Sequence, residues 1–243
     1  NFRNKVARAF CLLLVFVSIV YAGDVFLDAV ADPDSTRFWL RFQWIGIALV
    51  PAAYLHFSDV LLRTTNSFST LRRWLTIGAF VGGGISLALV LFSHALVDQV
   101  DLNPLNPLAA HFTAGPLFGL FTAFFFATSA YAAYNVVRAR NRALTPTSRR
   151  RMNYLLASIA APFSVFPYLM LTSPLINLGE RPLMFGFLAA AANIAITWMM
   201  VVMAYGVAYP GVPISDRAVK RNLIKFLIQA PTRASFLILA MLL

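Results

Sequence analysis

Long apolar runs separated by short polar loops dominate this chain, and the run at residues 39–63 has the clearest boundaries. It carries no charged residue from Phe42 to Ser58, and with its flanks it reaches the roughly 20 residues that an α-helix needs to cross a bilayer. Aromatic and basic residues at both of its ends are typical of membrane–water interfaces. Pro51 lies in the middle, where the carbonyl that it leaves unpaired and the bend that it causes have to be covered by neighbouring helices. The pattern therefore predicts a packed span inside a helix bundle.

Five further apolar runs have similar lengths and similar polar boundaries. They predict spans, with boundaries good to about three residues, at 6–30, 74–97, 113–137, 152–171 and 183–205. Pro162 and Pro167 predict a kink in the fifth span. Small residues that let helix backbones approach closely occur at residues 82–84 of the third span and 189–192 of the sixth. The fold class is an all-α polytopic membrane helix bundle with six full transmembrane helices.

The tail at residues 218–243 has a different pattern. Its basic residues share a segment with Val219, Leu223 and Phe226, which predicts a basic amphipathic helix lying along an anionic membrane surface. The apolar run at 235–243 predicts the start of a further span, although one tilted span from residue 223 onward explains the same residues. We therefore divide the chain into a six-span bundle, residues 1–217, and this tail. Both ends of the chain look like cuts in a longer protein.

The charged residues sort by loop. Fifteen of the 20 basic residues lie in the N-terminal segment and in the loops after the second, fourth and sixth spans, whereas seven of the nine acids lie in the other loops or their flanks. The positive-inside rule then predicts that residue 1 is cytoplasmic. The same positions assign the net charge of +11 to membrane anchoring and not to nucleic acid binding. The basic residues singled out for the membrane surface are Arg149, Arg150, Arg151, Lys220, Arg221 and Lys225.

Composition supports a membrane protein without a catalytic role. The chain is 60% hydrophobic and 12% charged, about half the charged fraction of an average soluble domain. Its single cysteine, Cys11, lies in an apolar run, so neither a disulfide nor a thiolate metal site is expected. The sequence contains no glycine-rich phosphate loop, zinc signature or nucleophile motif, and we expect no cofactor, no metal and no enzyme activity in this region.

Four residues are candidates for ligand binding. His94 at the end of the third span, Asp98 one turn later and His111 at the start of the fourth span are expected near the outer surface, where they could bind a cation or sense pH. The competing interpretation is that the two histidines cap helix ends. Gln43 is polar inside the second span, where it either binds a ligand or forms a hydrogen bond between helices.

The first two runs, FRNKVARAFCLLLVFVSIVYAG and LRFQWIGIALVPAAYLHFSDVLL, resemble the N-terminal seven-transmembrane region of bacterial histidine kinases and related GAF-domain signalling proteins. The similarity rests on the Arg-Asn pair before Phe10, the Gln43-Trp44-Ile45-Gly46 segment, Pro51 and His56-Phe57, and it covers most of residues 1–217. In that family a further span usually precedes the Arg-Asn pair. The resemblance implies an input module in the bacterial inner membrane, whose output domain, such as a kinase, a GAF domain, a cyclase or a phosphatase, follows inside the cell. The further apolar segment after Lys225 departs from the family pattern.

The leading functional hypothesis is therefore a membrane sensor that relays an envelope or membrane cue to a cytoplasmic output domain. Its expected partners are the lipid bilayer and other membrane helices or subunits, and its ligand is unknown. The alternative is an accessory or structural subunit of a respiratory or photosynthetic membrane complex. A transporter or cofactor-binding protein is a third class, which bound pigment or a polar path through the bundle would support.

Overall fold

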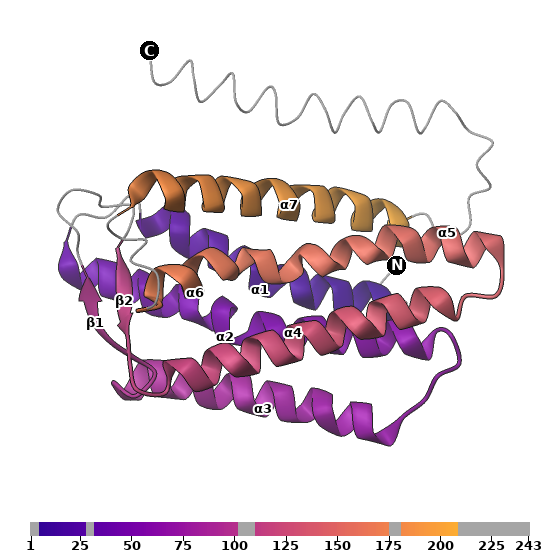
Figure 1. Cartoon of the computed structure of the whole chain (residues 1–243), viewed down its shortest axis with the longest axis horizontal. Coiled ribbons are helices and arrows are strands. Elements are labelled where there is room, and N and C mark those ends of the chain that lie inside the picture. Colours follow the sequence, from indigo (N-terminus) through magenta and orange to yellow (C-terminus); the bar gives the residue numbers. More distant parts are fainter. Residues whose placement is uncertain (1–4, 28–31, 102–109, 175–180, 209–243) are drawn as a thin grey trace, which may run out of the picture.

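The computed structural model describes residues 5–27, 32–101, 110–174 and 181–208 (Figure 1). In this part of the chain six helical segments are long and apolar enough to cross a membrane, which confirms the expected all-α polytopic bundle. The tail at residues 218–243, for which the sequence predicts an amphipathic helix and the start of a further span, lies outside the described residues.

The six segments run alternately up and down along the long axis of the bundle (Figure 1). Five of them are helix α1 (Lys5–Leu27), α2 (Pro33–Arg63), α3 (Thr70–Phe92), α4 (Phe118–Asn141) and α7 (Pro182–Ala208). The remaining segment is composite and consists of α5 (Pro146–Leu155), the 3₁₀ helix η2 (Leu156–Ser164) and α6 (Phe166–Thr172). The predicted kink of this span is therefore a nine-residue 3₁₀ stretch that contains Pro162.

Helix α2 is the central element, as the pattern at residues 39–63 predicted. It begins where Asp32 caps it, accepting a hydrogen bond from the Ser35 backbone N–H at 2.8 Å, and Pro33 occupies a first-turn position that tolerates proline. Its 31 residues span about 46 Å, more than the roughly 30 Å of hydrocarbon in a bilayer. From Gln43 to Leu62 nearly every side chain is buried, and the helix continues through Pro51. The neighbours that bury it are α1, α3, α4 and η2.

Glycines set the closest helix contacts. A Cβ atom on Gly46 of α2 would lie 2.6 Å from the Phe16 carbonyl oxygen of α1, and one on Gly83 of α3 would lie 2.7 Å from the Ala48 carbonyl oxygen of α2. No larger residue fits either crossing without moving a backbone. Of the predicted small-residue surface at 189–192 only Ala192 is buried, so that prediction is largely wrong.

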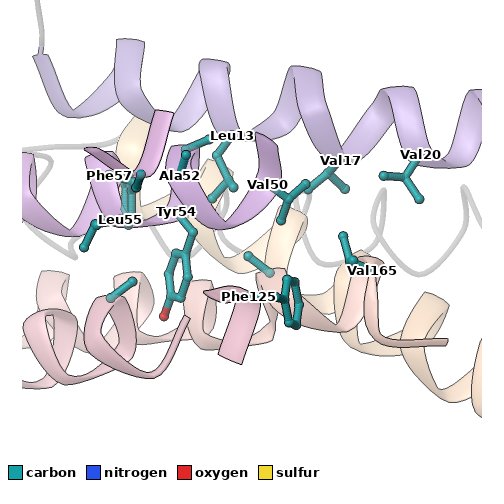
Figure 2. Packing of buried hydrophobic residues seen from close by; sticks show 14 of the residues in the cluster. Leu13, Val17, Val20, Val50, Ala52, Tyr54, Leu55, Phe57, Phe125 and Val165 are labelled. Atoms are coloured by element: carbon teal, nitrogen blue, oxygen red, sulfur yellow. The ribbon is translucent and has the colours of Figure 1, made fainter. Parts of the chain in front are cut away.

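The core consists of α2 side chains and side chains from the five other spans. Figure 2 shows Leu13, Val17 and Val20 of α1 above α2, with Phe125 of α4 and Val165 below it. Large apolar side chains also cover the outside of the bundle, among them Trp74, Phe92 and Phe187, which are more than half exposed. An apolar exterior of this kind suits a lipid environment.

Two span boundaries differ from the prediction because the loop between them folds as a β-hairpin. Strand β1 (Val97–Asp101) pairs antiparallel with β2 (His111–Ala114) in the register Val97↔Ala114, Val100↔Phe112 and Asp101↔His111, with an irregularity after Val97. Helix α3 therefore ends at Phe92 and not near residue 97, and α4 begins at Phe118 and not near residue 113. The hairpin lies at the end of the bundle opposite to the start of α5 (Figure 1).

Candidate functional site

The helix ends on the side of the start of α1 form the basic end of the bundle. In the described ranges this end carries eleven basic residues: Lys5, Arg8, Arg63, Arg72, Arg73, Arg138, Arg140, Arg142, Arg149, Arg150 and Arg151. Within those ranges it carries one carboxylate, Asp59. We call the opposite side, where the hairpin lies, the acidic end.

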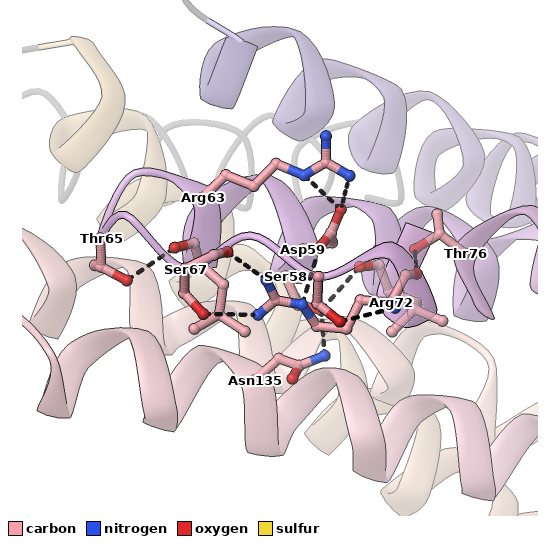
Figure 3. Close-up of polar contacts among 11 residues, drawn as sticks. Ser58, Asp59, Arg63, Thr65, Ser67, Arg72, Thr76 and Asn135 are labelled. Carbon is pink, nitrogen blue, oxygen red and sulfur yellow. Dashed lines mark hydrogen bonds and ion pairs between the residues drawn. The ribbon is translucent and has the colours of Figure 1, made fainter. Parts of the chain in front are cut away.

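Asp59 is buried between two arginines from different helices (Figure 3). Arg63, one turn later on α2, donates from Nε to Asp59 Oδ2 at 2.8 Å and places Nη2 2.6 Å from the same oxygen. Arg72 of α3 places Nε 3.3 Å from Asp59 Oδ1. The side chains of Asp59 and Arg72 are 3% and 4% exposed, whereas that of Arg63 is 40% exposed. The carboxylate therefore joins the end of α2 to the start of α3 through a buried ion pair.

The turn between α2 and α3 also provides hydrogen-bond acceptors for Arg72. Asn66 adopts a left-handed conformation with φ of 57°, and the N–H groups of Asn66 and Ser67 bond to the carbonyls of Arg63 and Leu62, the pattern of a Schellman motif. Arg72 then donates from Nη1 to Ser67 Oγ at 3.4 Å and from Nη2 to the Ser67 carbonyl. Arg72 Nη1 and Nη2 thus both donate to Ser67, whereas Nε lies at ion-pair distance from Asp59 without forming a hydrogen bond.

Helix α4 reaches this region through Asn135. Its Nδ2 donates to Ser58 Oγ at 3.4 Å, and Ser58 donates in turn to the Leu55 carbonyl at 2.8 Å (Figure 3). Ser58 and Asn135 are both fully buried, and Ser58 is the residue before Asp59. We call Ser58, Asp59, Arg63, Ser67, Arg72 and Asn135 the Asp59 cluster. It fastens three helices at the basic end, and its carboxylate is engaged by guanidinium groups on both oxygens.

The expected His94–Asp98–His111 site is only partly assembled. His94 Nδ1 lies 3.1 Å from Asp98 Oδ1, but both side chains are well exposed, and they lie in the loop and in β1 instead of on one helix. His111 lies in β2, opposite Asp101, and does not begin the fourth span. The described residues contain no group of three or more His, Cys, Asp or Glu side chains that could hold a metal ion.

Gln43 joins helices α1 and α2. Its side chain is 2% exposed, and Nε2 donates to the Val20 carbonyl of α1 at 3.3 Å. A Cβ atom on Gly23 of α1 would lie 2.6 Å from the Gln43 Cβ atom, so the two backbones are close at this point. The geometry favours the interhelical interpretation over ligand binding.

The predicted surface arginines lie at the start of α5. Arg149 and Arg150 are exposed, Arg151 is partly buried, and Arg149 Nη2 lies 3.5 Å from the Ala143 carbonyl. Nearby, Arg140 Nε of α4 donates to Asn153 Oδ1 of α5 at 2.9 Å and ties these two helices together. Lys220, Arg221 and Lys225 lie outside the described residues.

Sequence reasoning did not identify the buried pair of Asp59 with Arg72. The available signal was that Asp59 stands almost alone among basic residues, with Arg63 one turn later. A carboxylate in that position is expected to have at least one more cationic partner, because an acid is costly to bury unpaired.

Comparison with known proteins gave one family match. A family model described as the N-terminal 7TM region of histidine kinase matches residues 1–207. No curated protein and no solved structure matches the chain.

Proposed function

This chain belongs to the family of N-terminal 7TM regions of histidine kinases, and we propose that it relays a cue from the acidic end of its bundle to a cytoplasmic output domain. Membership of this family supports the assignment of the chain as a membrane sensor module of a signalling protein. Such a 7TM region is a non-catalytic input module. The proposal adds the direction of the relay and the element that carries it.

Charge supports an orientation with the basic end in the cytoplasm. Eleven basic residues and one carboxylate lie at that end in the described ranges. The other end carries five carboxylates and three arginines there: Asp24, Asp32, Asp34, Asp98, Asp101, Arg37, Arg41 and Arg181. Short loops with this excess of arginine and lysine stay on the cytoplasmic side of a bacterial membrane.

The main support for the proposed relay is the 3₁₀ helix η2. Runs of 3₁₀ helix longer than three or four residues are uncommon, and a stretch inside a longer helix often marks a hinge. This one has nine residues, contains Pro162 and is followed by Pro167 in the first turn of α6. Conversion to α-helix would shorten nine residues by about 4.5 Å and change the relative rotation of α5 and α6 by about 180°. A partial conversion would already move α5.

The neighbours of η2 connect both ends of the bundle. At the acidic end α6 packs against β2 of the hairpin, and at the basic end α5 bonds to α4 through Arg140 and Asn153. Along its length η2 packs mainly on α7, with further contacts to α4, α2 and α1. Ser158, Ala161 and Ser164 are small and buried, so neighbouring helices approach this segment closely and a change in η2 would be transmitted to them.

The test is Pro162→Ala in the full-length protein, because alanine restores the backbone N–H and favours α-helix. Pro146→Ala is the matched control, since Pro146 occupies the first turn of α5, where proline does not interrupt a helix. Spin labels on α4 and α5 measure the shift, and phosphorylation in membrane vesicles measures the output. We expect Pro162→Ala to change the label distance by several ångströms and to change basal output, and Pro146→Ala to change neither. A shifted distance with unchanged output would refute the relay.

A further inference from the structure

A groove opens between the start of α1 and the end of α2, on the outside of the basic end. It has a volume of 810 Å³ and is lined by Lys5, Val6, Arg8, Ala9, Leu12, His56, Val60, Arg63, Thr64 and Phe68. This size lies within the range of sites that bind small molecules.

Charge and apolar surface are separated along the groove. Lys5, Arg8 and Arg63 lie toward the helix ends, whereas Leu12 of α1 and His56 of α2 mark its deep end. Leu12 follows Lys5 by seven residues, so the groove extends about 10 Å along the helix axis from the cations toward the middle of the bundle. A ligand that fits it has a negatively charged head and an apolar chain.

The three basic side chains of the groove have donor groups that could bind an anionic ligand. In the described part of the chain neither Lys5 nor Arg8 forms an ion pair or a hydrogen bond with a protein group. Arg63 uses Nε and Nη2 on Asp59, which leaves Nη1 outside that pair. Arginine and lysine at a membrane surface are the usual partners of anionic lipid head groups.

We propose that this groove is a binding site for one anionic phospholipid, with its phosphate between Lys5, Arg8 and Arg63 and one acyl chain along Val6, Leu12 and Val60. A soluble phosphate has no apolar part that could contact the apolar half of the groove. The segment at residues 218–227 does not fit the groove as an occupant, because it is basic and would be repelled by the groove's cations. The proposal rests on this groove alone and does not depend on the relay.

The experiment measures lipid retention by native mass spectrometry of the full chain, titrated with phosphatidylglycerol or with phosphatidylcholine. Each cation removed near an anionic lipid is expected to weaken binding about fivefold, so Lys5→Gln/Arg8→Gln should weaken phosphatidylglycerol binding about 30-fold. Arg149→Gln/Arg150→Gln is the control, because it removes the same charge at the same end but outside the groove. Leu12→Trp fills the groove without changing charge and should also reduce retention.

The expected result is one retained phosphatidylglycerol, at least tenfold preferred over phosphatidylcholine and lost in both groove variants but not in the control. Equal retention of the two lipids, or equal loss in the groove and control variants, would overturn the proposal. Displacement of the lipid by millimolar inorganic phosphate would also overturn it and would assign a soluble anion. Retention is measured without any signalling output, so it fails or succeeds separately from the proposed function.

Discussion

Removing the charge of Asp59 should destabilise the protein more than removing either arginine that holds it. At the 3.3 Å that separates Arg72 Nε from Asp59 Oδ1, an effective dielectric constant of about 20 gives a gross attraction of about 5 kcal/mol. Desolvation offsets much of this attraction. Loss of one partner from a buried pair nevertheless costs about 3–5 kcal/mol, because it leaves an uncompensated charge. Asp59→Leu leaves the guanidinium of Arg72 buried without a carboxylate partner.

The two arginines should differ from each other. Arg63→Met removes a half-exposed partner on the same helix and should cost about 0.5 kcal/mol. Arg72→Met removes a buried partner, but Asp59 keeps Arg63, so we expect about 2 kcal/mol. The double variant Asp59→Leu/Arg72→Met removes both buried charges together and should be more stable than Asp59→Leu alone.

Equilibrium unfolding in mixed detergent micelles measures these free energies, with intact helix content as the control for folding. The reasoning is refuted if the losses of Asp59→Leu and Arg72→Met add in the double variant. Equal costs for Arg63→Met and Arg72→Met would also refute it, since burial is the difference between them.

Three further predictions use single positions. Gly46→Leu should destabilise the bundle by about 3 kcal/mol in the same unfolding assay, because its Cβ meets the Phe16 carbonyl, whereas Gly84→Leu, with open space around it, should be tolerated. Asn66→Gly should be neutral or stabilising by up to about 1 kcal/mol, and Asn66→Val should be destabilising, because φ at this position is positive. The Ser35 N–H holds the pKa of Asp32 below its ordinary value, so this cap stabilises the protein above the unfolded-state pKa of about 3.9 and loses its contribution as pH falls through the lowered pKa. Thermal melting from pH 7 to pH 3 should show a stability difference between the native protein and Asp32→Asn that shrinks as pH falls, and a pH-independent difference would contradict this linkage.

The spans and their alternation were predictable because a membrane demands about 20 consecutive apolar residues with charges at the ends. Burial of Gln43 and Pro51 followed from the same pattern, since polar groups and broken hydrogen bonds at membrane depth need covering helices. These are local demands, and a local reading of the sequence detects them.

What the sequence did not reveal depends on contacts between segments. The hairpin between α3 and α4 consists of two short strands whose pairing is set by register and not by a strong local pattern. The Asp59–Arg72 pair exists because the left-handed Asn66 turn brings the start of α3 back to α2. Two prolines predicted a kink, but a nine-residue 3₁₀ helix also needs the packing of α7 and α4 around it.

Orientation in the membrane is the claim on which the relay depends, and cysteine labelling in intact cells tests it directly. In a Cys11→Ser background, Gln99→Cys at the hairpin and Arg142→Cys after α4 place one exposed thiol at each end. A membrane-impermeant maleimide should label position 99 in intact cells with a permeabilised outer membrane, and position 142 only after lysis. Labelling of position 142 in intact cells, or of both positions from the same side, would contradict the account.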